Sequence, residues 1–478
     1  MNFRIIAYIV GWVCNFQAAF MMLPLLTAGI YREKDFSAFL LAMLVCLVVG
    51  VPLTRKKPKN KVFYIKDGCV AVALSWLALC IFGAIPFVVS GCIPHPIDAL
   101  FETVSGFTTT GSSILSDVEV LPHCILIWRS FTHWIGGMGV LVFLLSLLPL
   151  AGGYHMNLMK AESPGPSVSK LVPKVQSTAK ILYTIYFGMT LIQLALLLIG
   201  RVPLFDSLCI TFGTAGTGGF GIVNDSLGSY STYCQVVTTI FMILFGVNFS
   251  AYYLVLTKKF RQAFKYEEVR YYFGIIAVAI VIIALNTAHL FRNLLTAFQQ
   301  AAFQVGSIIT TTGYATTDFN VWPVFSKTIL VILMFVGACA GSTGGGFKCG
   351  RLLLVFKSLR RNIQKMLRPQ RIQAVRSNKQ VVSEKVLENT NAYLAAYVLI
   401  IMFSLLVISI DGFSVGTNFS AVLACFNNIG PGLELVGPTC NFSIYGPLAK
   451  IVLIFDMLAG RLEIFPILIL LSRDTWRR

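Results

Sequence analysis

Long apolar runs separated by short polar segments dominate this chain. A helix needs about 20 mainly apolar residues to cross a hydrocarbon core of about 30 Å, and runs of this length with few charges recur from end to end. The predicted spans are 4–28, 36–53, 67–90, 122–148, 181–200, 233–257, 271–288, 323–341, 391–410 and 446–471. The pattern therefore predicts an all-α integral membrane protein with ten transmembrane helices.

Composition supports this prediction. Of the 478 residues, 56% are hydrophobic and 12% are charged, about half the charged fraction of soluble domains. A soluble enzyme is therefore excluded. The net charge of +18 is concentrated between the apolar runs, so we expect no nucleic-acid partner. The twelve cysteines lie mostly inside apolar runs, which is typical of buried small hydrophobes and not of a disulfide framework or a zinc site.

Lysine and arginine gather in alternate loops. The basic loops are 54–66, 149–180, 258–270 and 348–385, whereas the intervening loops hold mostly acids. Because basic loops stay in the cytoplasm, we expect an inner-membrane protein with both termini in the cytoplasm. The basic segment 348–385 first anchors this orientation, and secondarily offers a surface to anionic lipid or to a cytosolic partner.

Four segments between an outward and an inward span resemble one another, and each ends in a glycine-containing turn. The aligned turns are Thr109-Thr110-Gly111, Gly216-Thr217-Gly218, Thr311-Thr312-Gly313 and Asn428-Ile429-Gly430. An internal repeat of this kind divides the chain into units. The expected units are an N-terminal hairpin (1–64) and four pore repeats, at 65–150, 175–262, 268–375 and 388–478.

The stretch before each turn is too short to cross a membrane and too apolar for a solvated loop, which indicates a re-entrant half-helix. Carbonyl oxygens and threonine hydroxyls can replace the hydration shell of a cation. Glycine reaches positive φ, which lets neighbouring carbonyl groups point the same way. The carboxyl ends of the half-helices add partial negative charge that favours a cation. The fourth turn offers no threonine hydroxyl, because Asn428 and Ile429 stand there. For a single turn an extracellular loop would be the simpler interpretation, but four copies predict a cation selectivity filter around one axis.

At these residues the chain resembles the TrkH branch of the Trk/Ktr/HKT superfamily of potassium transporters, over essentially its whole length. Further matches are Ser130–Gly139, Glu162–Pro166 and Gly460–Glu463. The resemblance implies four membrane–pore–membrane repeats around a central ion pathway, a homodimer with one pore per protomer, and a cytosolic, nucleotide-binding TrkA-type subunit that gates it. It also favours potassium, because Gly111 stands where sodium-selective plant HKT proteins carry serine.

A glycine-rich segment, residues 337–346, interrupts one predicted span. Its glycines and polar residues are Gly337, Gly341, Ser342, Thr343, Gly344, Gly345 and Gly346. A continuous helix disfavours this composition, because each glycine costs up to about 1 kcal/mol relative to alanine. The segment does not match a phosphate-binding P-loop, since Phe347-Lys348 follows it. A packing kink is one alternative; as in the family it resembles, we expect a gating loop below the filter.

Arg461 lies in the last apolar run, too deep for its side chain to reach the inner surface easily. A charge at such depth is expected to face water or a partner. Pairing with Asp456 or Glu463 is one possibility. We expect instead that Arg461 projects into the pathway below the filter, raises the barrier to cations and contacts the glycine-rich segment.

These patterns together predict potassium uptake, with potassium bound at the filter residues as substrate, no covalently bound cofactor and no catalytic site. An ion-coupled symporter is one alternative, although its repeats would be expected to be inverted, and these run in the same direction. Sodium-dependent, Ktr-like transport is another. An enzyme or receptor is disfavoured because no nucleophile–base pair, metal-ligand cluster or cofactor motif stands out. Asp117, Asp318 and Glu434 follow the turns and either concentrate cations at the mouth or are ordinary loop acids.

Overall fold

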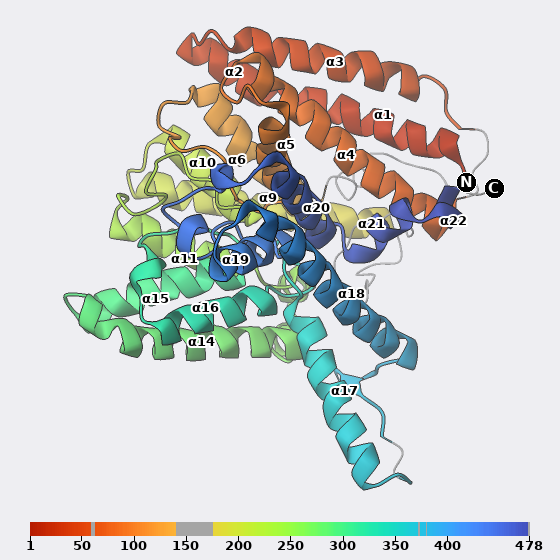
Figure 1. Cartoon of the computed structure of the whole chain (residues 1–478), viewed down its shortest axis with the longest axis vertical. Helices are drawn as coiled ribbons and strands as arrows, with labels where there is room; N and C mark the ends of the chain where they lie inside the picture. Colours follow the sequence, from red (N-terminus) through yellow and green to blue (C-terminus); the bar gives the residue numbers. More distant parts are fainter. Residues whose placement is uncertain (59–62, 140–174, 371–372, 379, 477–478) are drawn as a thin grey trace.

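The computed structural model describes residues 1–58, 63–139, 175–370, 373–378 and 380–476. Almost all regular structure in this part of the chain is helical (Figure 1). The strands described are β1 (Arg376–Ser377) and β2 (Gln380–Val381), which pair antiparallel. The predicted all-α fold is therefore confirmed. The end of the predicted span 122–148 and the Glu162–Pro166 motif lie outside the described residues.

The first predicted span consists of two helices, α1 (Phe3–Phe20) and α2 (Met22–Tyr31). Helix α3 (Phe36–Thr54) returns beside α1, and α1 also packs against α4 (Ile65–Val89). This N-terminal hairpin lies along one edge of the molecule (Figure 1).

The rest of the chain repeats one order of elements: a long helix, a short helix, a turn and a further helix that is followed by a break. The first segment contains α4, α5 (Pro96–Phe107) and α6 (His123–Gly137). The second contains α9 (Val175–Ile199), α10 (Leu204–Gly216), α11 (Thr232–Phe245) and α12 (Phe249–Leu256).

The third and fourth segments follow the same order. The third contains α14 (Glu267–Thr287), α15 (Leu294–Ile309), α16 (Val324–Val336) and α17 (Cys349–Leu367). The fourth contains α18 (Glu384–Ile408), α19 (Val415–Phe426), α20 (Pro447–Arg461) and α21 (Ile464–Leu471). The described chain also contains the short α-helices α13 (Phe260–Phe264) and α22 (Arg473–Trp476).

Within the described residues, six helical stretches are long and apolar enough to cross a membrane on their own. They are Phe3–Tyr31, Phe36–Thr54, Ile65–Val89, Ser177–Ile199, Glu267–Leu290 and Glu384–Asp411. Helices α11 and α12, bent by 94° at their junction, would make a seventh span. Ten spans therefore stay a prediction, because several predicted spans are broken or shorter than a bilayer requires.

The breaks fall at comparable places, in the helix that follows each turn. The backbone leaves its helix with positive φ at Gly139 (83°), Gly337 (67°) and Glu463 (66°), and bends sharply between α11 and α12. Helical backbone has negative φ, so each of these conformations ends a helix. The break at Gly337 agrees with the interruption predicted from the glycine-rich segment 337–346. At the other breaks apolar residues continue on both sides, which is why the sequence predicted unbroken spans there.

The second halves of the short helices α5, α10, α15 and α19 are almost wholly buried, whereas the long helices expose many apolar side chains. This distribution suits a core surrounded by lipid-facing helices. The start of α1 and the helix α22 lie at the same end of the molecule (Figure 1), where Lys66 Nζ donates to the carbonyl oxygen of Asp474 at 2.9 Å.

Candidate cation pathway

The four short helices α5, α10, α15 and α19 end in the same backbone geometry. A left-handed residue follows each helix: Thr109 (φ 57°), Thr217 (56°), Thr311 (59°) and Asn428 (55°). The next N–H donates to the carbonyl five residues earlier at 2.8 or 2.9 Å; the pairs are Thr110–Ser105, Gly218–Gly213, Thr312–Ser307 and Ile429–Ala424. This is the hydrogen bond of a Schellman motif. Because a β-branched residue rarely adopts this conformation, at a cost of about 1–3 kcal/mol, the surrounding structure must impose it.

A glycine with positive φ follows in each turn: Gly111 (79°), Gly219 (76°), Gly313 (87°) and Gly430 (102°). A Cβ added to any of them would lie less than 3.0 Å from a carbonyl oxygen of the next turn; these oxygens belong to Gly218, Thr312, Ile429 and Thr110, respectively. The contacts run from the first turn to the second, third and fourth, and back to the first. The turns therefore form a closed ring, which we call the filter ring (residues 109–111, 217–219, 311–313 and 428–430).

The second turn differs by one residue from the predicted alignment. The alignment matched Gly218 with Gly111, but the φ angles and the contacts match Gly219 with Gly111. Gly216 is the last residue of α10, and it packs against the carbonyl group of His133. The adjacent glycines Gly218 and Gly219 fit either alignment by sequence, and only the backbone conformation distinguishes them.

Most threonine hydroxyls of the filter ring are engaged by neighbouring protein atoms. Thr110 Oγ1 lies 2.8 Å from Thr108 Oγ1 and accepts a hydrogen bond from Asn428 Nδ2 at 2.9 Å, and Thr312 Oγ1 lies 2.7 Å from Thr310 Oγ1. The buried hydroxyl of Thr109 has no hydrogen-bond partner among the described residues. Backbone carbonyls are therefore the more available ligands, and hydroxyls contribute less than the sequence suggested.

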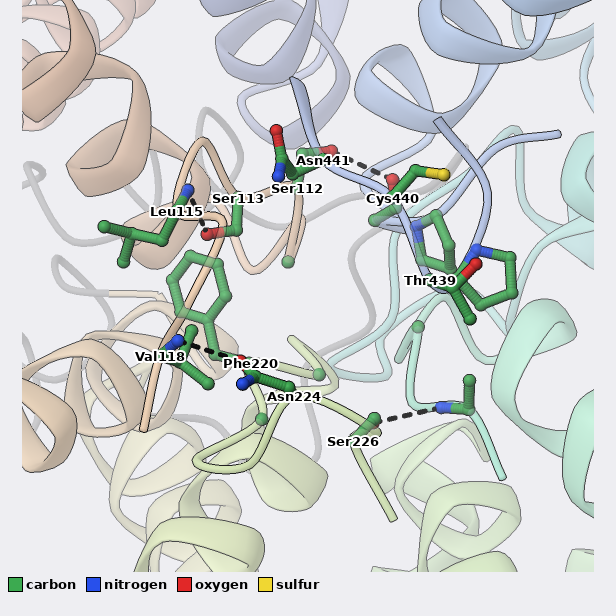
Figure 2. Close-up of a pocket in the computed structure, with 18 of the residues that line it drawn as sticks. Ser112, Ser113, Leu115, Val118, Phe220, Asn224, Ser226, Thr439, Cys440 and Asn441 are labelled. Atoms are coloured by element: carbon green, nitrogen blue, oxygen red, sulfur yellow. Dashed lines mark hydrogen bonds between the residues drawn. The ribbon is translucent and has the colours of Figure 1, made fainter. Parts of the chain in front are cut away.

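A cavity of about 130 Å³ adjoins the four glycines of the filter ring (Figure 2). The loops that follow the four turns, which we call the outer loops, surround it with side chains that include Ser112, Asn224 and Thr439. No acidic residue of the described chain lines it, and Arg129 is the one charged residue in its lining. Because Arg129 is paired with Glu102 at 2.9 Å, a cation in this cavity would meet mainly neutral polar groups.

Hydrogen bonds between the outer loops form a second closed ring around this cavity. All four are 2.9 Å long: Val118 N to Asn224 Oδ1, Leu227 N to the Ala315 carbonyl, Glu434 N to Asn320 Oδ1, and Phe442 N to the Ser113 carbonyl. They join the first loop to the second, the second to the third, the third to the fourth, and the fourth to the first. The loops thereby hold the filter ring together from one side.

The acids that follow the turns have local partners. Asn224 donates to Asp117 Oδ1 at 2.9 Å, and this hydrogen bond lowers the pKa of Asp117. Hydrogen bonds from Ser414 and Thr417 lower the pKa of Glu434. Asp318 accepts from Asn320 N at 2.9 Å. These acids are absent from the described lining of the cavity, so loop stabilisation accounts for them better than cation capture.

The glycine-rich segment 337–346 is an irregular loop between α16 and α17, and it packs against the residues that begin two of the turns. Gly345 N donates to Thr311 Oγ1 at 2.5 Å. A Cβ added to Gly344 would lie 2.7 Å from the carbonyl oxygen of Thr310, and one added to Gly345 would lie 2.5 Å from that of Asn427. Only residues without side chains fit so close to the filter ring.

Arg461, at the end of α20, is 8% exposed and joins three parts of the molecule. Its guanidinium donates to the carbonyl oxygen of Thr343 at 2.8 Å, and to those of Gly136 and Gly137 at 2.5 Å each. The expected contact with the glycine-rich segment is thus present. The acids considered as partners have other contacts: Glu463 forms an ion pair with Arg351, and Asp456 accepts from Ser404 at 2.7 Å.

Glu268 is a site residue that the sequence did not reveal. It is 7% exposed, and its Oε1 accepts from Ala340 N, within the glycine-rich segment, at 2.6 Å and from Gly350 N, near the start of α17, at 2.9 Å. Lys348, also buried, donates to the carbonyl oxygen of Gly344. Both charges lie in segments predicted as basic cytoplasmic loops, so only their burial in the fold sets them apart.

Arg129 and Glu102 form a fully buried ion pair behind the first turn, which the sequence analysis also missed. Arg129 donates to the carbonyl oxygen of Gly221 at 3.1 Å and lies over the ring of Phe220 at 4.2 Å. The signal that could have identified Arg129 in the sequence is its charge within an apolar run.

His133 links the first and second segments beside this ion pair. Its Nδ1 donates to the carbonyl oxygen of Gly106 at 2.8 Å, and its Nε2 accepts from Phe220 N at 3.2 Å. This pattern requires a neutral imidazole.

Comparison with known proteins gives one consistent result. Residues 35–476 match the model of the TrkH family, described as a cation transport protein. The Trk system potassium uptake proteins TrkH of Salmonella typhimurium (strain LT2) and Escherichia coli (strain K12) are each 35% identical to this chain, with 100% of both chains covered. The crystal structure of the potassium transporter TrkH from Vibrio parahaemolyticus is similar with a TM-score of 0.89, at 31% identity and with 100% of both chains covered.

Proposed function

The chain belongs to the TrkH family of cation transport proteins, and we propose that it takes up potassium across the cytoplasmic membrane through the filter ring. The observation that carries this proposal is the closed ring of four turns, each with a left-handed residue followed by a glycine. The names of the relatives, which are potassium uptake proteins, support potassium as the substrate.

The filter ring supplies oxygen ligands without a full negative charge. Carbonyl groups of the turns replace the water around a potassium ion, and the carboxyl ends of α5, α10, α15 and α19 converge on the same place. The partial negative charge of these helix ends favours a cation. The membrane potential, worth about 2.3 kcal/mol per charge for each 100 mV, then draws the ion inward.

The glycine-rich loop and Arg461 form the gate in this proposal. The loop packs against the turns through Gly344 and Gly345, and Arg461 holds it through the carbonyl oxygen of Thr343. A positive charge beside the ion pathway raises the electrostatic barrier to a cation. Movement of the loop away from the third and fourth turns, together with Arg461, would open the pathway.

We extend the proposal to the assembly and its place in the cell. The protein acts in the inner membrane with both termini in the cytoplasm, as a homodimer with one pathway per protomer. A cytosolic TrkA-type nucleotide-binding subunit controls the gate. The relatives' membership of the Trk system and the alternation of basic loops support these statements.

Growth of a potassium-uptake-deficient bacterium in low potassium tests the function, with the chain expressed alone and with a TrkA-type subunit. We expect rescue that the filter substitution Gly111→Asp abolishes. Ion flux into vesicles that contain the purified protein should then be larger for potassium and rubidium than for sodium. Absence of rescue with either arrangement, despite membrane insertion, would contradict the proposal, and a strict requirement for a proton or sodium gradient would favour a symporter.

A further inference from the structure

Helix α17 combines an apolar stripe with basic residues and leaves the body of the molecule obliquely to α14 and α16 (Figure 1). Phe356, Leu359, Ile363 and Met366 recur every three or four residues and are 50% to 83% exposed. Residues at this spacing share one face of a helix. An amphipathic helix of this type, in a chain with several apolar helices, is suited to the membrane interface.

A groove of about 350 Å³ lies between α14 and α17, within the range of ligand-sized pockets. Its lining comprises Tyr271, Ile275, Cys349, Leu352, Leu353, Phe356, Lys357 and Arg360. Apolar side chains form most of this lining. Lys357 and Arg360 follow Phe356 along α17 and supply positive charge at one end of the groove. The groove is thus amphipathic, with an apolar wall beside a basic end.

The groove lies at the level expected for the cytoplasmic lipid headgroups. Tyr271 is near the start of α14, directly after the basic loop 258–270, and tyrosine is enriched where a span meets the interface. An apolar wall at this level faces acyl chains, and a basic end faces phosphate groups.

The two basic residues differ in what already contacts them. Lys357 Nζ is bound to Glu267 at 2.5 Å and to the carbonyl oxygen of Arg376 at 2.8 Å. Arg360 is exposed and has no hydrogen-bond or ion-pair partner among the described residues. An anion in the groove would therefore bind chiefly to Arg360, whose planar guanidinium matches a phosphate.

We propose that an anionic phospholipid of the cytoplasmic leaflet binds in this groove. Its phosphate binds Arg360, and its acyl chain lies against Ile275, Leu353 and Phe356. Charge complementarity favours an anionic over a zwitterionic headgroup. One basic residue near an anionic leaflet raises the binding constant about fivefold. The site is separate from the filter ring, and lipid binding can be measured whether or not ions are transported.

Native mass spectrometry of the purified full chain tests the site, with phosphatidylglycerol and phosphatidylcholine of matched acyl chains added in equal amounts. We expect the wild type to retain phosphatidylglycerol preferentially, and Arg360→Gln to lower this retention about fivefold. Arg361→Gln is the matched control, because it removes the same charge from the adjacent position, where Arg361 pairs with Glu384 at 2.6 Å. This control should retain the lipid as the wild type does.

A second variant tests the apolar wall. Leu353→Trp places a larger side chain in the groove and should reduce the retention of both lipids. Equal losses in Arg360→Gln and Arg361→Gln, or no headgroup preference in the wild type, would overturn the proposal. Displacement of the lipid by inorganic phosphate alone would show a simple anion site, and dissociation of a dimer by Leu353→Trp would show that a second copy occupies the groove; either result would also overturn it.

Discussion

The glycines of the filter ring leave no space for a side chain. At Gly111 an added Cβ would collide with the carbonyl oxygen of Gly218, so even alanine would push two neighbouring turns apart. The positive φ of Gly111 adds a second cost for any L-residue. The identity of this residue is therefore set by the spacing between the turns.

Gly111→Ala should reduce potassium flux by about tenfold or more, because overpacking costs about 1–3 kcal/mol and each 1.4 kcal/mol is a factor of ten. Flux into vesicles at equal protein density measures the effect. Gly188→Ala is the control, since nothing lies within 4 Å of a Cβ added there in α9. Equal flux in the two variants would show that the filter ring tolerates a side chain.

Arg461→Gln should increase ion leak in the absence of any activating partner. The substitution removes a buried positive charge and its hydrogen bonds to the carbonyl oxygens of Thr343, Gly136 and Gly137. Hydrogen bonds from a charged group are worth about 1.5–3 kcal/mol, so the open fraction should rise by about tenfold or more. Arg270→Gln, at an exposed position, is the control. Lower conduction in a stable Arg461→Gln protein would contradict the gating role.

At the scale of elements, the glycine-rich loop has few side chains to hold it and depends on charged neighbours. Glu268 accepts hydrogen bonds from Ala340 N within the loop and from Gly350 N in α17, and thereby ties α14 to both the loop and the start of α17. A buried N–H left without an acceptor costs about 1–3 kcal/mol. The position of the loop is therefore sensitive to this carboxylate.

Glu268→Ala should loosen the loop, with faster hydrogen exchange in peptides spanning residues 338–350 and a higher basal flux. Two partly buried N–H groups lose their acceptor in this variant, which favours movement of the loop away from its present position. Glu388→Ala, at an exposed position of α18, should change neither quantity. Unchanged exchange in Glu268→Ala would show that Glu268 does not position the loop.

The outer loops should show a pH dependence through Glu434. Its hydrogen bonds from Ser414 and Thr417 hold its pKa below the ordinary value of 4.5. A carboxyl group with a lowered pKa in the folded state stabilises the fold above its unfolded pKa, and this stabilisation disappears as the pH falls through the lowered value. Thermal unfolding of wild type and Glu434→Gln should therefore differ most near neutral pH and converge below pH 4.5. A constant difference between the two proteins would contradict this.

At the scale of the whole molecule, apolar run length and the four glycine turns were enough to predict a helical fold with four similar segments. The predicted turns do come together, although Gly219, and not Gly218, is the positive-φ glycine equivalent to Gly111. The contacts around the glycine-rich loop and Arg461 could not be predicted, because Glu268 and Ala340, or Gly136 and Arg461, are far apart along the chain. Apolar residues on both sides of Glu463 also hid the break there, whereas the glycines of residues 337–346 were enough to predict the break at Gly337.

The closed ring is built from one polypeptide, so each of its positions is encoded separately. In a pore made of four identical subunits, one codon change alters all four sides at once. Here a change alters a single quadrant, and the other three keep their oxygens. The fourth quadrant, with Asn428 and Ile429 in place of threonines, shows such a local divergence. Ion preference in this architecture can therefore evolve in small, asymmetric steps.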